Sequence, residues 1–75
     1  MKHPVDVAAG ERIRDLRMAR GLSQTNIADA CGISFQQMQK YESGQNRVSL
    51  SRLIEICKAL RVRPGEIVDS LMEVS

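Results

Sequence analysis

The chain has 75 residues, a formal net charge of +2 and two aromatic side chains, Phe35 and Tyr41. This length allows one small domain with an aliphatic core, and we treat residues 1–75 as that domain, with its core at about residues 6–71. No apolar stretch approaches the roughly 20 residues of a membrane-spanning helix, and the N-terminus lacks the apolar segment of a secretory signal. We therefore expect a cytoplasmic protein with no membrane partner.

The first predicted helix follows a short disordered arm, Met1 to Val5, in which Pro4 disfavours helix. Asp6 is the expected N-cap of this helix, and Gly21 is expected to end it. Its inner face consists of apolar residues at helical spacing: Ala9, Ile13 and Leu16. Gly10 costs about 1 kcal/mol relative to alanine inside a helix. We therefore expect another helix to approach it closely, with the C-terminal helix as the candidate.

Residues 22–44 contain two short helices and the turn between them. Ser23 and Ser34 are the predicted N-caps, because each hydroxyl can accept a hydrogen bond from a free first-turn amide. Ser34 and Gln37 also have the spacing of a capping box. Gly32 ends the first of the two helices, because glycine enters the left-handed conformation at little cost. The inward residues are Ile27, Ala28, Cys31, Met38 and Tyr41. Together these features predict a helix-turn-helix.

Amide side chains dominate the outward face of the second of these helices. The face consists of Phe35, Gln36, Gln39, Lys40 and Ser43. Glutamine can pair with N6 and N7 of adenine, and lysine can donate to O6 and N7 of guanine. A solvated surface without a partner, which is the alternative, would more often carry Glu and Lys. The face therefore favours recognition of bases in the major groove.

The C-terminal part of the chain predicts two more helices after a loop at residues 43–48. Ser49 is the expected N-cap of the fourth helix, and Pro64 suits the first position of the fifth. The apolar stripe of the fourth helix is Leu53, Ile54, Cys57 and Leu60, and that of the fifth is Ile67, Val68 and Leu71. Residues 72–75 are expected to fray. Because no strand pattern appears, the predicted fold class is all-α with five helices.

No metal, cofactor or catalytic group is expected. Cys31 and Cys57 lie on apolar helix faces and are interpreted as small buried side chains in a reducing compartment, not as a disulfide or zinc ligands. His3 stands alone in the N-terminal arm. An enzyme is not expected, because the chain lacks a Ser-His-Asp set, paired inward carboxylates and a phosphate-binding glycine loop.

Several short motifs, in this order and spacing, resemble the phage-repressor and Cro type (XRE-like) of helix-turn-helix transcriptional regulator. They are Arg-Ile-Arg-Asp-Leu-Arg at 12–17, Gly-Leu-Ser-Gln at 21–24, Ile-Ala at 27–28, Gly-Ile-Ser at 32–34, Lys-Tyr-Glu-Ser-Gly at 40–44 and Leu-Ile-Glu-Ile-Cys-Lys-Ala-Leu at 53–60. The resemblance covers about residues 6–71. It implies a compact five-helix fold of the lambda-repressor type and sequence-specific binding of double-stranded DNA in transcription regulation.

The resemblance also implies which residues contact DNA, with the helix of about residues 35–43 in the major groove. Gln36 is the first candidate for base readout, and Lys40 is expected to reach a base or a phosphate. Phe35 departs from the phage repressors, which often have a hydrogen-bonding residue there; it either touches a thymine methyl group or packs within the protein. The full expected set is Gln24, Ser34, Phe35, Gln36, Gln37, Gln39, Lys40, Asn46 and Arg47.

Within that set, Gln24 is expected to meet a phosphate, and Asn46 and Arg47 to position the DNA backbone. Gln37 is expected to be occupied by the capping box and to lie near a phosphate. The resemblance further pairs Arg17 with Glu42. Both fall near the inner edges of their helices, where an unpaired charge would be costly.

A net charge of +2 attracts DNA only weakly, so we expect a homodimer on an inverted-repeat operator. The fourth and fifth helices are the predicted contact, because Met72 and Val74 extend the apolar stripe of the fifth. The alternative function is a protein-interaction module of the same fold, similar to antitoxins and coactivators. An exposed Phe35 and the low net charge favour that alternative, whereas the glutamine-rich face favours DNA.

Overall fold

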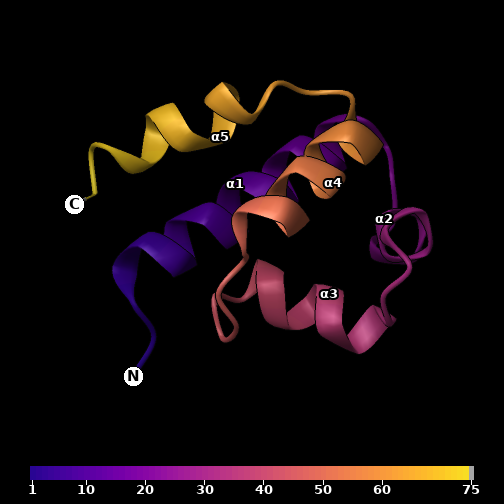
Figure 1. Ribbon diagram of the computed structural model, residues 1–75, viewed down its shortest axis with the longest axis horizontal. Coiled ribbons are helices and arrows are strands. Elements are labelled where there is room, and N and C mark those ends of the chain that lie inside the picture. The colour runs from indigo at the N-terminus through magenta and orange to yellow at the C-terminus, as the bar shows by residue number, and fades with distance from the viewer. Residues whose placement is uncertain (75) are drawn as a thin grey trace.

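The computed structural model describes residues 1–74, which form five α-helices and contain no strand. The helices are α1 (Pro4–Ala19), α2 (Gln24–Cys31), α3 (Phe35–Glu42), α4 (Leu50–Leu60) and α5 (Pro64–Leu71). The longest helix, α1, packs against α3 and α5, whereas α2 packs against α3 and α4 (Figure 1). The Cα radius of gyration is 11.1 Å, as expected for a compact chain of this length, about 11 Å. The predicted all-α fold is therefore confirmed.

The structure corrects the start of the first helix. We expected a disordered arm over Met1–Val5 and an Asp6 cap, but α1 begins at Pro4, and Nδ1 of His3 accepts a hydrogen bond from the Val5 amide at 3.1 Å. Proline suits the first helical position, because its fixed φ fits the helix and the amide it lacks would have no partner there. The residue restricted by Pro4 is His3, which lies outside the helix and serves as its cap. The Asp6 carboxylate is therefore not used as the N-cap and is available for another contact.

The close approach at Gly10 comes from α3, so the prediction that it comes from the fifth helix is wrong. A Cβ atom at residue 10 would lie within 3.0 Å of the carbonyl oxygens of Tyr41 and Glu42. A Cβ atom at residue 44, where the glycine has a φ of +77°, would likewise lie within 3.0 Å of the backbone of Val7. Two glycine contacts therefore hold the first half of α1 against the C-terminal end of α3.

The core is aliphatic and follows most of the predicted faces. Its buried members are Ile13, Leu16, Ile27, Ala28, Cys31, Met38, Tyr41, Leu53, Ile56, Cys57, Leu60 and Ile67, whereas Ala9 and Leu71 are half-buried. The predictions for Ile54 and Val68 are wrong, because their side chains are 41% and 40% exposed. Ile56, which was not predicted, is fully buried. Packing turns the face of α4 that carries Leu53, Ile56, Cys57 and Leu60 towards the core and leaves Ile54 outside it.

Both cysteines are buried and free, as predicted. Burial raises the pKa of the Cys31 thiol, and the nearby Glu55 adds to the effect while Arg52 opposes it. Burial likewise raises the pKa of Cys57, with a smaller contribution from Glu66. Both thiols are therefore protonated at neutral pH and serve as core side chains.

Each helix within residues 1–74 is too short or too polar to cross a lipid bilayer.

Candidate nucleic-acid interface

The helix-turn-helix is built by local capping, much as predicted. The Ser23 hydroxyl accepts from the Asn26 amide at 3.0 Å, and Oδ1 of Asn26 accepts from the Ser23 amide at 2.9 Å. Gly32 then ends α2 with a φ of 68°. At the start of α3 the Ser34 hydroxyl accepts from the Gln37 amide at 3.0 Å. The reciprocal bond from Gln37 is not formed, so this cap is only half of the predicted capping box.

The outward face of α3 is exposed as predicted. Phe35, Gln36, Gln39, Lys40 and Ser43 are all exposed, with Phe35 at 42%. The opposite face is buried through Met38, Tyr41 and Glu42. The core therefore holds one side of α3, and the amide-rich side is free to meet another molecule.

A polar cluster fixes the C-terminal end of α3. Nε and Nη2 of Arg17 donate to the two carboxylate oxygens of Glu42 at 2.7 and 3.0 Å, which confirms the predicted pair. Nη1 of the same guanidinium donates to the carbonyl of Leu22 at 2.8 Å. Nε2 of Gln24 donates to Glu42 at 2.9 Å. Through these bonds α1, the start of α2 and the end of α3 are held in one arrangement.

The sequence predicts a phosphate contact for Gln24 and does not predict its hydrogen bond to Glu42. Its side chain is half-buried against Glu42, which lies 18 residues away in the sequence. No local pattern indicates such a distant contact. One of the two N–H groups of its Nε2 is used by Glu42, and the second has no partner among the described residues.

The loop after α3 is anchored to α1 by an ion pair that the sequence did not reveal. Nε of Arg47 lies 3.1 Å from Oδ2 and 3.3 Å from Oδ1 of Asp6. The Arg47 side chain is 73% exposed, and the contact to Asp6 uses Nε alone. Its two terminal amino groups are therefore open to solvent. Asn46 is half-buried, and its backbone N–H donates to the Lys40 carbonyl at 3.2 Å.

Two of the predicted DNA-binding residues, Gln24 and Gln39, line a polar hollow beside α1, together with Arg14, Arg17, Glu42 and Ser43. Arg47 lies away from that hollow, at the edge of an apolar one. Arg14 was missing from the sequence prediction, because a single arginine on an outer helix face has no distinguishing pattern.

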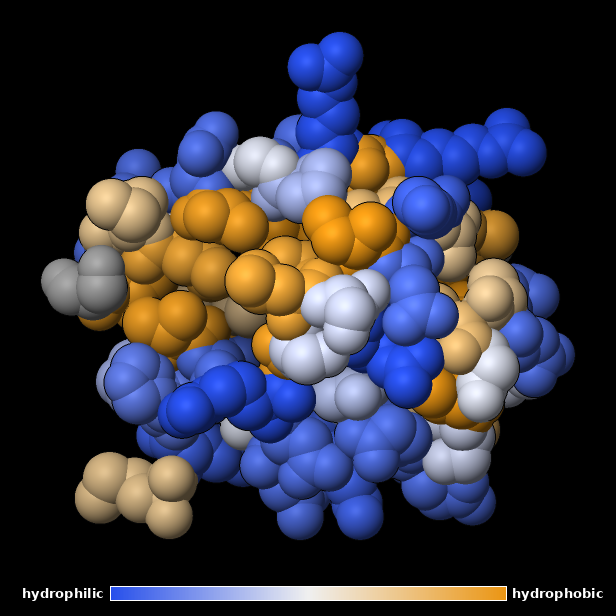
Figure 2. Space-filling view, viewed as in Figure 1, coloured by the Kyte–Doolittle hydropathy of each residue, from blue (hydrophilic) through white to orange (hydrophobic). Residues whose placement is uncertain are grey.

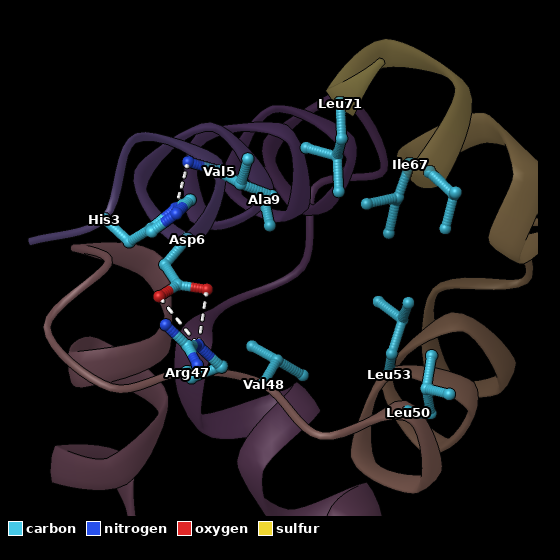
Figure 3. A pocket seen from close by; sticks show the side chains of 11 residues that line it. His3, Val5, Asp6, Ala9, Arg47, Val48, Leu50, Leu53, Ile67 and Leu71 are labelled. Carbon is cyan, nitrogen blue, oxygen red and sulfur yellow. Dashed lines mark hydrogen bonds and ion pairs between the residues drawn. The ribbon is translucent and has the colours of Figure 1, made fainter. Parts of the chain in front are cut away.

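A second surface is apolar and lies where α1, α4 and α5 meet. It contains a hollow of about 460 Å³, called the apolar hollow here, whose walls are formed mainly by Val5, Ala9, Val48, Leu50, Leu53, Ile67, Val68 and Leu71. Figure 3 shows side chains from opposite walls, such as Val5 and Ala9 of α1 and Ile67 and Leu71 of α5, with the Asp6–Arg47 pair at the edge. In Figure 2 apolar residues gather on this part of the molecule, whereas the side formed by α3 is polar.

Across residues 1–74, no three His, Cys, Asp or Glu side chains are grouped so that they could hold a metal ion.

Comparison with known proteins places these features in context. A family model described as helix-turn-helix matches residues 13–67. An uncharacterized HTH-type transcriptional regulator of Sinorhizobium fredii is 52% identical over 61 residues, which cover 81% of this chain and 43% of that protein. An uncharacterized transcriptional regulator in the ATPase CF(0) region of Rhodospirillum rubrum is 53% identical over 60 residues, covering 80% and 56%. The chain thus spans about half the length of the curated relatives it matches.

Solved structures with similar folds include two regulators. The restriction-modification controller protein of Aeromonas hydrophila has a TM-score of 0.78 at 38% identity, covering 81% of this chain and 92% of that one. The clp gene regulator of C. glutamicum has a TM-score of 0.87 at 23% identity, covering 92% and 90%. The second likeness is one of fold alone.

Proposed function

The chain belongs to the helix-turn-helix family of the phage-repressor and Cro type, whose members regulate transcription and are not enzymes, and from this premise we propose that it binds double-stranded DNA in a sequence-specific manner. In this proposal α3 lies in the major groove. The observation that carries it is the exposed, amide-rich face of α3 on a helix whose other side is locked into the core.

The exposed residues of α3 have the chemistry of base readout. Gln36 and Gln39 present both a donor and an acceptor, which suits the N6 and N7 edge of adenine. Lys40 can donate to guanine or to a phosphate. Phe35, at the first position of α3, has no polar atom in its side chain, and we assign it to the methyl group of a thymine. An acidic or apolar face would have supported a protein partner instead.

Residues around α3 would position the DNA backbone. Gln24 stands at the first position of α2, and Arg47 follows α3 in the loop with its terminal amino groups exposed. Gln37, within α3, and Asn46, in the loop after it, are half-buried, and Ser34 is exposed at the start of α3. Contacts between these side chains and the DNA backbone would strengthen binding and fix the position of the protein on the duplex, but they would not distinguish one base sequence from another.

A homodimer is part of the proposal, with a second copy covering the apolar hollow. Two of the residues that line the hollow are exposed, Leu50 at 79% and Val68 at 40%, and Val74, which follows α5, is 44% exposed. A two-fold axis would bring the same surface of each copy together and place two α3 helices about 34 Å apart, one turn of DNA. The matching operator is an inverted repeat. One copy alone, with a net charge of +2, gains little from phosphate attraction.

Selection from random duplexes tests the proposal. The wild-type protein should enrich an inverted repeat, and Gln36→Ala should lose roughly 1–3 kcal/mol of affinity for it and relax one base pair in each half-site. Arg47→Ala is the matched comparison: it should weaken specific and random duplexes alike and lower the salt dependence. If no motif is enriched, the DNA proposal fails. Equal losses on specific and random DNA for Gln36→Ala would remove that residue from base readout.

A further inference from the structure

The polar hollow beside α3 has a volume of about 440 Å³ and brings together three helices. It is lined by Arg14, Arg17, Gln24, Gln39, Glu42 and Ser43. Gln39 and Ser43 belong to the exposed face of α3, and Gln24 begins α2. The hollow therefore opens beside the surface that would meet DNA, although Arg14 comes from α1, outside the helix-turn-helix.

The charges around the polar hollow leave one positive charge uncompensated. Arg17 and Glu42 neutralise each other, with side chains only 12% and 4% exposed. Arg14 is exposed, and among residues 1–74 it forms no ion pair or side-chain hydrogen bond. The single carboxylate in the lining already accepts hydrogen bonds from Arg17 and Gln24. An anion entering the hollow would thus meet a net attraction.

The remaining polar atoms of the lining are mainly donors. Gln24 retains one N–H of Nε2 after its bond to Glu42. The side-chain amide of Gln39 has two N–H groups, and it forms no hydrogen bond with the described residues. Arg14 offers five N–H donors in a planar fork that matches phosphate oxygens. The polar hollow therefore combines hydrogen-bond donors from three helices with one positive charge, and this combination suits a phosphate group.

We propose that the polar hollow binds one phosphate of the DNA backbone and that Arg14 of α1 supplies its charge. This inference rests on the proposed function, because DNA that contacts the exposed face of α3 carries its backbone past the adjoining hollow. Contacts of this kind fix the orientation of the protein on the duplex and are independent of base sequence.

Removing the charge at Arg14 tests the inference. The variants are Arg14→Gln, Arg14→Lys, which keeps the charge, and Arg63→Gln, which removes an exposed arginine from the α4–α5 connection on the far side from α3 (Figure 1). Affinity for the selected duplex is measured over a range of salt concentrations. Affinity falls as salt rises, and Arg14→Gln should make the slope of log affinity against log salt less negative by about 0.9 for each protomer bound, because one phosphate contact is lost. Arg14→Lys should retain most of the slope, and Arg63→Gln should match the wild type.

Ethylation interference then locates the contact. Ethylation of one phosphate in each half-site should hinder the wild type and Arg63→Gln but no longer affect Arg14→Gln. An unchanged pattern and slope in Arg14→Gln would overturn the inference while leaving sequence-specific binding intact. So would equal slopes in Arg14→Gln and Arg63→Gln, since net charge alone would then explain the loss. Titration with inorganic phosphate in the absence of DNA separates a free-anion site: binding abolished by Arg14→Gln with no change in the DNA pattern would also overturn it.

Discussion

The pair of Arg17 and Glu42 gives the sharpest test of how the recognition helix is held. The Glu42 carboxylate accepts three hydrogen bonds, of which two come from Arg17, and its side chain is 4% exposed. The change Arg17→Met keeps the aliphatic stem of the side chain and removes its charge and its donors. A buried carboxylate would then depend on Gln24 alone.

The expected loss is large for a domain of this size. Removing one partner of a buried pair costs about 3–5 kcal/mol, and the 12% exposure of Arg17 places this pair at the lower end, about 3 kcal/mol. A 75-residue domain has a total stability of roughly 4 to 11 kcal/mol. Arg17→Met with Glu42→Leu removes both charges, so the double variant should lose only about 1–2 kcal/mol, chiefly through the bond from Arg17 to the Leu22 carbonyl.

Urea unfolding followed by circular dichroism measures these differences in the wild type, both single variants and the double variant. Because each single change should cost about 3 kcal/mol and the double change only about 1–2 kcal/mol, the double-mutant cycle should give a coupling of about 4–5 kcal/mol. Arg14→Met is the matched control, because Arg14 lies one turn earlier on α1 and is exposed; it should change stability by less than about 0.5 kcal/mol. Additive effects of Arg17→Met and Glu42→Leu would refute the reasoning.

Three further predictions concern other contacts. Gly10→Ala should destabilise the protein by about 3 kcal/mol or more, because the added methyl group would clash with two carbonyl oxygens of α3. Gly65→Ala is the control and should be close to neutral, because the nearest atom to its methyl group would lie 3.7 Å away. Equal unfolding curves for the two variants would contradict this prediction. Val68→Asp, in the apolar hollow, should shift the sedimenting species from dimer to monomer. Met18→Asp should not, because Met18 is an exposed apolar residue that does not line the hollow. A wild type that stays monomeric at high micromolar concentration would end the dimer proposal. Phe35→Ala should abolish discrimination between thymine and uracil at one operator position, as measured by competition binding; continued discrimination would exclude the methyl contact.

Local signals in the sequence determined the helices and most of their ends. Ser23, Ser34 and Ser49 cap their helices, and each hydroxyl accepts from the amide three residues later. Gly32 adopts the left-handed conformation that ends α2. Such interactions involve residues three or four positions apart, so the pattern of side chains indicates them without knowledge of the fold. The exposed amide-rich face of α3 follows from the same periodicity, once the inward residues are known.

Contacts between distant segments were decided by the tertiary structure. The partner of Gly10 proved to be the end of α3, and the partner of Asp6 proved to be Arg47, 41 residues away. Burial of Ile56 in preference to Ile54 also depends on the direction from which neighbouring helices approach α4. Spacing along a helix defines its faces, but only packing selects which face meets which neighbour. For the same reason the sequence could place Gln24 at the start of a helix, and only the fold could bring it beside Glu42 and the polar hollow that contains Arg14.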